Sequence, residues 1–182
     1  MLELIWELNV VDWLEIKEFF KDTFKYILVV IGVLLVALYV VTLEQVIGPS
    51  MSPTYKENDV VVLDKLYYKI FKINRGDIVS VSYADTKYLI KRVIGLPGEY
   101  VEIKDNQIYI DGKILEEPYL DNVENYDFDL RELGYEKIPD GYYLLLGDNR
   151  TDSLDSRDPK VGLISKKNFI GKVRFKIWPL FK

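Results

Sequence analysis

The feature that most constrains this chain is an apolar run near its N-terminus. Residues 26–43 contain no charged side chain and are bracketed by Lys25 and Glu44. At about 1.5 Å of rise per residue, a helix of this length spans roughly 27 Å, close to the thickness of the hydrocarbon core of a bilayer. The run therefore predicts a transmembrane anchor over 25–44. A buried helix of a soluble domain is the alternative.

The basic residues around this run predict its orientation. Lys17, Lys21 and Lys25 precede it, and the first basic residue after it is Lys56. Because the cytoplasmic flanks of membrane helices are enriched in Lys and Arg, we expect a cytoplasmic N-terminus and an extracytoplasmic chain after residue 44. The run is too long, and the leader before it too charged, for a cleaved signal peptide. The predicted location is the cell membrane, crossed once.

Residues 1–24 are predicted to form an amphipathic helix that is cytoplasmic or lies in the membrane interface. Acidic side chains recur at helical spacing opposite an apolar face that includes Trp6 and Trp13. Tryptophan on such a face is typical of interfacial helices, whereas the excess of acids makes anionic lipids poor partners. We expect this helix to pack on a protein partner or on the bilayer.

The chain contains neither cysteine nor histidine. The lack of cysteine excludes disulfides, thiolate metal sites and cysteine nucleophiles. The lack of histidine removes the Ser-His-Asp triad and the usual zinc sites. A nucleophilic mechanism would therefore use Ser, Thr, Lys or a carboxylate as nucleophile, with Lys, Asp, Glu, Tyr or an α-amine as base.

The composition and pattern of the chain after Glu44 are typical of a β-rich domain. Short runs of Val, Ile, Tyr and Leu recur between turn signals such as Pro97-Gly98. Strands are predicted near 59–65, 77–83, 88–95, 99–104, 107–111, 142–147 and 170–177. The predicted fold class is mostly β, with a compact antiparallel β-sheet domain over 45–182 preceded by the amphipathic helix and one transmembrane helix. The acidic stretch 116–140 is predicted as a solvated loop or rim.

Two residues of this domain are candidates for nucleophilic catalysis. Ser50 lies in a Gly-Pro-Ser turn shortly after the apolar run, and Pro53 stiffens the backbone that follows. Lys91 lies in a strand that is otherwise apolar on both faces. Because burial disfavours an ammonium group, a lysine kept dry can be neutral and accept a proton from a serine hydroxyl. The alternative is an exposed lysine on a strand edge, with Arg92 turned inward or capping the strand.

Four segments resemble, in order, the sequence boxes of the bacterial type I signal peptidases, also called leader peptidases. They are SMSPT at 50–54, RGDIV at 75–79, KRVIGLPGE at 91–99 and GDNRTDSLDSR at 147–157. One such box is a weak signal, but four in the family's order and spacing are specific. The resemblance implies a membrane-anchored serine endopeptidase that removes signal peptides from secreted preproteins with a Ser nucleophile and a Lys general base.

The resemblance also implies a role for each matching residue. Ser50 is expected as the nucleophile, with its backbone N–H in the oxyanion hole, and Lys91 as the general base. Ser153 is expected to hydrogen-bond to the Lys91 amine and orient it. A supporting ion-pair network is expected from Asp148, Arg150, Asp155 and Arg157. Some family members assist the oxyanion hole with a serine two positions before the nucleophile, where this chain has Gly48.

The partners expected from the resemblance are signal peptides of exported preproteins and the lipid bilayer, with the secretion translocon nearby and the chain itself monomeric. Nucleic acid is not expected, because the net charge is −5 and no basic run exceeds two residues. We expect no cofactor and no metal, because the acids of 147–157 do not match the spacing of a calcium-binding loop.

Two other functions share some of these features. A self-cleaving repressor-type peptidase also pairs Ser and Lys, but the apolar anchor and the lack of a DNA-binding module argue against it. A non-enzymatic, membrane-tethered β-domain that binds a partner would place Ser50 and Lys91 far apart. The distance between these two side chains therefore discriminates between an enzyme and a binding module.

Overall fold

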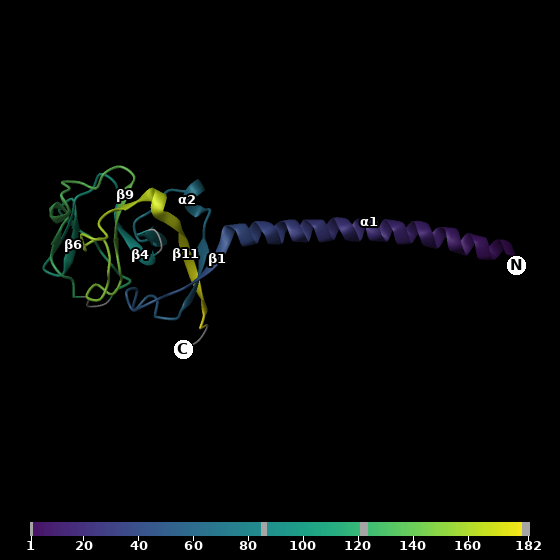
Figure 1. The fold of residues 1–182 in the computed structure, drawn as a ribbon, viewed down its shortest axis with the longest axis horizontal. Helices are drawn as coiled ribbons and strands as arrows, with labels where there is room; N and C mark the ends of the chain where they lie inside the picture. Colours follow the sequence, from purple (N-terminus) through teal and green to yellow (C-terminus); the bar gives the residue numbers. More distant parts are fainter. Residues whose placement is uncertain (1, 85–86, 121–123, 180–182) are drawn as a thin grey trace. The chain divides into compact units, whose positions relative to one another are not determined.

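The computed structural model describes residues 2–84, 87–120 and 124–179. The chain divides into two compact units, Met1–Val40 and Val41–Lys182. The first unit is one helix, α1 (Leu2–Val40), drawn in purple and blue in Figure 1. Its part Glu15–Val40 is long and apolar enough to cross a membrane by length and composition.

The end of α1 differs from the boundary that the sequence predicts. The uncharged run extends to residue 43, but the helix ends at Val40 and the next residues form strand β1 (Val41–Gln45). The β-branched residues Val41 and Thr42 fit an extended backbone well. The apolar run 26–43 therefore contributes to both α1 and β1. Residues 2–24 of the amphipathic stretch and residues 26–40 of the apolar run belong to one continuous helix.

The second unit is built on a seven-stranded sheet whose described pairings are all antiparallel. This confirms the predicted mostly β, antiparallel fold. The strand order is β1-β2-β11-β3-β4-β9-β10. Its remaining strands are β2 (Val60–Asp64), β3 (Ile78–Tyr83), β4 (Lys87–Gly95), β9 (Tyr142–Leu146), β10 (Ile164–Ser165) and β11 (Phe169–Trp178).

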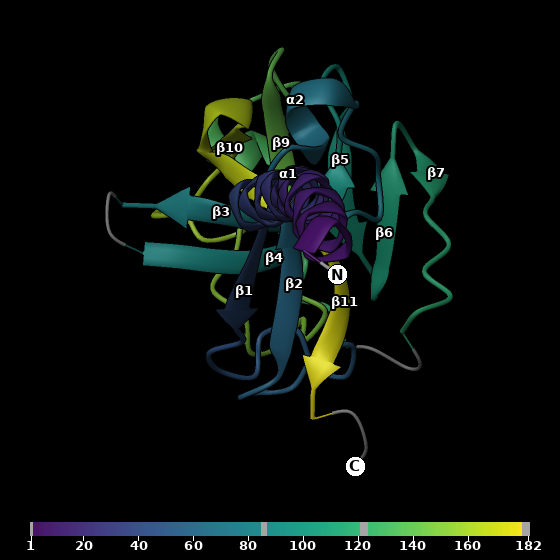
Figure 2. The same ribbon diagram turned by 90° about the vertical axis from the view of Figure 1, so that its right-hand side faces the viewer.

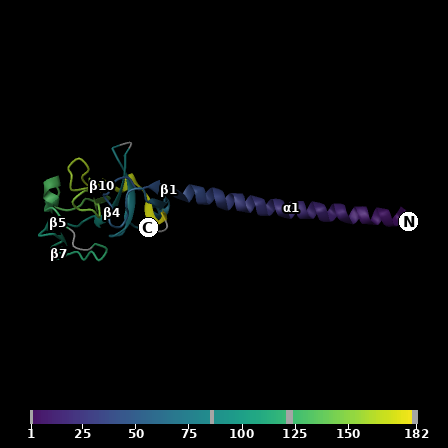
Figure 3. The ribbon, with the colours of Figure 1, turned by 90° about the horizontal axis from the view of Figure 1, so that it is seen from below.

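A second sheet of four strands has the order β7-β6-β5-β8. Its strands are β5 (Val101–Lys104), β6 (Gln107–Ile110), β7 (Lys113–Ile114) and β8 (Phe128–Asp129). Figures 2 and 3 show β5 and β7 on the side of the domain away from β1. Its described residues also form three short helical segments, namely α2 (Tyr67–Ile70), η1 (Leu130–Leu133) and η2 (Lys166–Asn168).

The acidic stretch 116–140 is not a solvated loop throughout, which corrects the sequence-based expectation. Phe128, Leu130 and Ile138 are almost fully buried and belong to the same apolar cluster as strands β4, β5 and β9. Aromatic and aliphatic residues interleaved with the acids anchor the stretch, because burying them removes apolar surface from water. The acidic composition of 116–140 does not show which of its residues are buried.

Candidate active site

Ser50 lies in the turn that follows β1, and the backbone around it is fixed on both sides. Met51 is fully buried, so the turn is anchored in the apolar core. The amide of Ser52 donates to the carbonyl of Pro49 at 2.9 Å, and that of Asn149 donates to the carbonyl of Ser50 at 3.1 Å. The Ser50 hydroxyl is therefore held on a braced turn rather than on a mobile loop.

Lys91 reaches this hydroxyl from strand β4. Its Nζ donates to Ser50 Oγ at 2.6 Å, and the residue is 2% exposed. Burial lowers the pKa of Lys91 to about 8, with Arg157 acting in the same direction, while Asp155 and Asp148 oppose the shift. The alternative of an exposed lysine is therefore wrong, and so is the expectation of a large Ser50–Lys91 separation that a binding module requires.

This pair has the chemistry of a nucleophile and its base. A serine hydroxyl needs a proton acceptor within hydrogen-bond distance before it can attack a carbonyl. An amine with a pKa near 8 is substantially neutral in mildly alkaline solution, whereas an ordinary lysine is not. The arrangement suits acyl transfer to and from Ser50.

Ser153 lies beside the pair but does not form the expected hydrogen bond to Lys91. Its hydroxyl is buried and has no hydrogen-bond partner within normal geometry among the described residues. It is near enough to Asp155 to help lower the pKa of that carboxyl. Ser153 therefore lies at the site, without the orienting contact that the sequence resemblance implies.

Gly147 explains why the last box approaches the nucleophile so closely. A Cβ atom at this position would lie 2.5 Å from the Ser50 carbonyl oxygen and 2.1 Å from Ser153 Oγ. Only glycine allows the two segments to come this near without a shift. The amide of Gly147 donates to Asp155 Oδ2 at 3.0 Å, which fixes the segment from the other side.

Asp155 and Arg157 form one of the expected ion pairs. Arg157 Nη2 lies 2.8 Å from Asp155 Oδ2, and Arg157 Nε lies 2.9 Å from Oδ1. Burial would raise the pKa of Asp155, but Arg157 and the Gly147 amide outweigh it and hold that pKa below its usual value. Asp155 is thus a buried carboxylate that remains charged near the catalytic pair.

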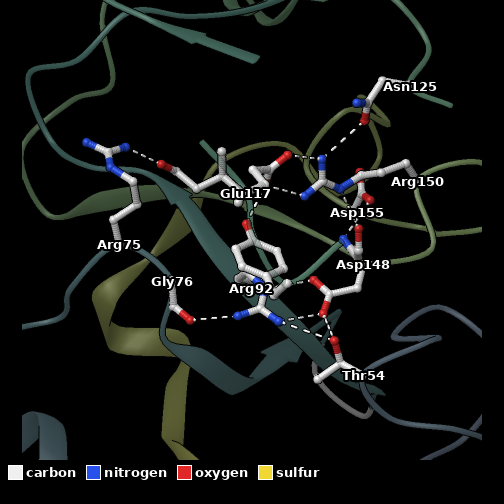
Figure 4. A network of polar contacts seen from close by, with 12 residues as sticks. Thr54, Arg75, Gly76, Arg92, Glu117, Asn125, Asp148, Arg150 and Asp155 are labelled. Carbon is white, nitrogen blue, oxygen red and sulfur yellow. Dashed lines mark hydrogen bonds and ion pairs between the residues drawn. The ribbon is translucent and has the colours of Figure 1, made fainter. Parts of the chain in front are cut away.

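Asp148 pairs with Arg92, a residue that the sequence interpretation left without a role (Figure 4). Arg92 makes a two-pronged contact to the carboxylate at 2.8 and 2.6 Å, and its Nη1 donates to the Gly76 carbonyl at 3.1 Å. Thr54, in the turn after Ser50, donates its hydroxyl to the same carboxylate. Asp148 therefore ties the nucleophile turn to the strand that carries Lys91.

Arg150, which was expected in the supporting network, pairs with Glu117 rather than with Asp148. Its guanidinium contacts Glu117 at 2.6 and 2.8 Å and Asn125 at 3.2 Å (Figure 4). The neighbouring Tyr119 places its ring 3.7 Å from the Arg92 guanidinium carbon. Glu117 and Tyr119 were missed because the acidic stretch was taken as solvated. The one feature of the sequence that indicates their role is an aromatic residue, Tyr119, within a run of acidic residues.

A cleft of about 620 Å³ opens beside the catalytic pair. Its walls include residues 43–47, at the end of β1 and just after it, residues 88–91 of β4, and Ser50 and Leu154. Within the described residues β1 pairs with β2 alone, and β4 pairs with β9 only from Arg92 onward. Both walls therefore present a strand edge whose backbone is unpaired, which suits an extended peptide.

No cluster of three or more potential metal ligands occurs among the described residues. The chemistry outlined above, a hydroxyl activated by an amine, does not call for a metal or a cofactor.

Comparisons with known proteins agree with this chemistry. The family model described as "Signal peptidase, peptidase S26" matches residues 17–178. The chain is 41% identical over 135 residues to signal peptidase I V of Bacillus subtilis, covering 69% of this chain and 79% of that protein. It is 36% identical over 159 residues to signal peptidase I S of the same organism, covering 84% and 85%.

A solved structure supports the same relationship. The crystal structure of a signal peptidase I from Enterococcus faecalis V583 aligns with a TM-score of 0.51 at 35% identity. The alignment covers 58% of this chain and 99% of that one.

Proposed function

The chain belongs to the type I signal peptidases of peptidase family S26, membrane-anchored serine peptidases that remove signal peptides from preproteins, and from this premise we propose that Ser50 is its nucleophile and Lys91 its general base. The observation that carries the proposal is the 2.6 Å contact between Lys91 Nζ and Ser50 Oγ. The burial that lowers the pKa of Lys91 to about 8 supports it.

The reaction proceeds in two halves. The neutral Lys91 amine takes the hydroxyl proton as Ser50 Oγ attacks the scissile carbonyl, and the resulting ammonium gives a proton to the departing amine as the peptide C–N bond breaks. The signal peptide is then an ester of Ser50. Lys91 next takes a proton from a water molecule that attacks this ester, and Ser50 leaves with the proton restored.

The Ser50 backbone N–H is the proposed oxyanion donor. Among the described residues it makes no hydrogen bond, so it remains available to the negative oxygen of the tetrahedral intermediate. Gly48 contributes no hydroxyl to the oxyanion hole. Asp148 and Arg92 support the turn through Thr54, and Asp155 with Arg157 supports the Gly147 segment. Arg150 donates from Nε to the Gly147 carbonyl at 2.9 Å and also holds Glu117.

The signal peptide is proposed to bind as an extended strand in the cleft between β1 and β4. The unpaired edges on both walls offer backbone donors and acceptors to such a strand. We further propose that residues 1–24 are cytoplasmic or interfacial, that the apolar part of α1 is the anchor, and that the β domain is extracytoplasmic. In this arrangement a monomer works at the bilayer, near the translocon that delivers its substrates.

The decisive experiment measures preprotein cleavage by the full chain in lipid vesicles. Ser50→Ala and Lys91→Ala are each expected to lower kcat/KM by about 10⁴-fold, because each removes one half of the nucleophile–base pair. Ser165→Ala and Lys113→Ala, which lie in β10 and β7, are the matched controls and keep wild-type turnover. Folded Ser50→Ala or Lys91→Ala protein that still cleaves would overturn the assignment.

The pH dependence gives an independent test. Because the reaction needs the neutral amine, acylation should fall as pH drops through the pKa of Lys91, with a limb near pH 8. A limb near 10.5, the ordinary lysine value, would contradict a buried base.

A further inference from the structure

Glu44 occupies an unexpected position on β1. Thr42 and Glu44 lie on one face of the strand, directly opposite Leu63 and Val61 of β2. Both of these β2 residues are fully buried. Because side chains alternate across a strand, Glu44 points to the apolar, inward face of the sheet, where a charged residue is rare.

The Glu44 side chain crosses the inside of the sheet. Its Oε1 accepts a hydrogen bond of 3.2 Å from Ser80 Oγ of β3, and Ser80 is fully buried. In the sheet β1 and β3 are separated by β2 and β11. Neighbouring strands lie about 4.8 Å apart, so a flat sheet could not bring these side chains together. The sheet therefore curves, and the carboxylate lies within its concave side.

Glu44 borders two cavities at once. The first is the cleft of about 620 Å³ that contains Ser50 and Lys91. The second has a volume of about 560 Å³. The two share Leu43, Glu44 and Tyr88. The second cavity is lined mainly by apolar side chains, among them Leu63 and Ile170. A peptide strand lying in the first cleft can thus direct a side chain past Glu44 into the second cavity.

The Glu44 carboxylate has one hydrogen-bond partner, Ser80, among the side chains that the structure describes, and it forms no ion pair with any of them. Burial raises the pKa of Glu44, and the Ser80 hydrogen bond opposes this. A half-buried carboxylate with spare acceptor capacity gains from a hydrogen-bond donor, most of all from a cation.

We propose that Glu44 determines substrate specificity, favouring signal peptides that carry a basic or hydroxyl side chain at one position upstream of the cut and disfavouring an acidic one there. The inference rests on the proposed function and adds a charge preference to it. The stem of a lysine packs against Leu63, Ile170 and Tyr88, and its ammonium reaches the carboxylate. A glutamate at the same position meets a like charge in a partly desolvated cleft.

The test uses a series of preproteins with Ala, Ser, Lys or Glu at each of the second to sixth positions before the cut. Cleavage by the full chain in neutral vesicles gives kcat/KM for each substrate. At one position, the Lys substrate is expected to exceed the Glu substrate by roughly tenfold. Glu44→Gln keeps an acceptor for Ser80 but removes the charge, so this ratio should fall close to one.

The control is Glu57→Gln, an exposed change that alters the net charge equally. It should leave the Lys-to-Glu ratio as in the wild type, which separates a local effect of Glu44 from a general effect of charge. The ratio is taken within each variant, so a change in overall activity cancels.

Three results overturn the inference. They are a ratio near one at every position in the wild type, a ratio unchanged by Glu44→Gln, and a ratio lowered equally by Glu57→Gln. Either of the first two results would leave Glu44 with a structural role only, as the acceptor of a hydrogen bond that links β1 to β3. The Ala substrate keeps the two proposals apart. Its cleavage by the wild type and not by Ser50→Ala upholds the catalytic pair, whatever the charge series shows.

Discussion

Lys91 and Arg92 are consecutive residues of β4, and their side chains enter two differently built parts of the domain. Both are deeply buried, at 2% and 6% exposure. Lys91 has the hydroxyl of Ser50 as its hydrogen-bond partner, whereas Arg92 has the two-pronged carboxylate of Asp148 and the face of Tyr119. Burial is therefore common to the two side chains, and what differs is the partner of each, a neutral hydroxyl for Lys91 and a carboxylate for Arg92.

The two side chains therefore suit different roles, Lys91 as a base and Arg92 as a support of the fold. An amine without a contacting carboxylate gives up its proton more readily and can serve as a base. A guanidinium with a fitted carboxylate stays charged and can fasten two segments together. Asp155 and Asp148 act on Lys91 only through space, which leaves its pKa lowered to about 8.

The largest expected effect comes from placing at position 91 the same kind of side chain that stands at position 92. Lys91→Arg keeps a positive, hydrogen-bonding group near Ser50 but replaces an amine that can deprotonate by a guanidinium that does not. We expect kcat for preprotein cleavage to fall by about 10⁴-fold, because the base is lost while the charge remains. Lys113→Arg on β7 is the control. Activity within tenfold of wild type would show that a neutral amine is not required.

The next effect comes from depriving Arg92 of its carboxylate. Asp148→Ala leaves a buried guanidinium unpaired and removes the acceptor of Thr54. The free energy of unfolding should fall by about 3 kcal/mol, as for other broken buried pairs. Urea denaturation followed by near-ultraviolet circular dichroism measures it. Asp140→Ala, at an exposed carboxylate, is the control. An equal loss of unfolding free energy in the two variants would show that the Arg92–Asp148 pair contributes nothing particular to stability.

A smaller and opposite effect is expected from relieving Lys91 of its burial cost. Lys91→Met fills the same space without a charge, and at pH 7 the free energy of unfolding should rise by roughly 2 kcal/mol. In the wild type the folded pKa is about 8 and the unfolded one 10.5. The unfolded chain therefore binds more protons between these values, and wild-type stability rises with pH there.

The gain from Lys91→Met should accordingly be full below pH 8 and disappear near pH 10.5. Denaturation curves at a series of pH values check this. A gain that does not vary with pH would indicate better packing rather than relief of a buried charge.

The smallest effect concerns the aromatic face over Arg92. Tyr119→Leu keeps apolar bulk but removes the ring whose centroid lies 3.7 Å from the guanidinium carbon, together with the hydroxyl that donates to Glu117. A loss of about 1 kcal/mol in the free energy of unfolding is expected, together with little change in the pH limb of catalysis. Tyr126→Leu, at an exposed ring, should cost less than half of that. A shifted limb would mean that the two sides of β4 are coupled.

The sequence by itself determined the local elements and the chemical identity of the site. The apolar run predicted the membrane-length helix, and seven short runs rich in Val, Ile, Tyr and Leu predicted β2, β3, β4, β5, β6, β9 and β11 within a few residues of their ends. Such features depend on the periodicity of neighbouring residues, which a single sequence displays. The absence of histidine and cysteine, with the motifs around Ser50 and Lys91, restricted the chemistry to a serine–lysine pair.

Tertiary structure alone decided where one element ends and which partner each charge takes. Residues 41–43 fit a membrane helix as well as a strand, and pairing with β2 makes them part of β1. Arg92 and Arg150 are equally plausible partners for Asp148 in the sequence, yet one contacts it and the other binds Glu117. The inward direction of Glu44 and the lowered pKa of Lys91 likewise depend on strands that are distant in sequence. Burial and counter-charge are properties of the assembled fold, so residue order can name the candidates but cannot set their surroundings.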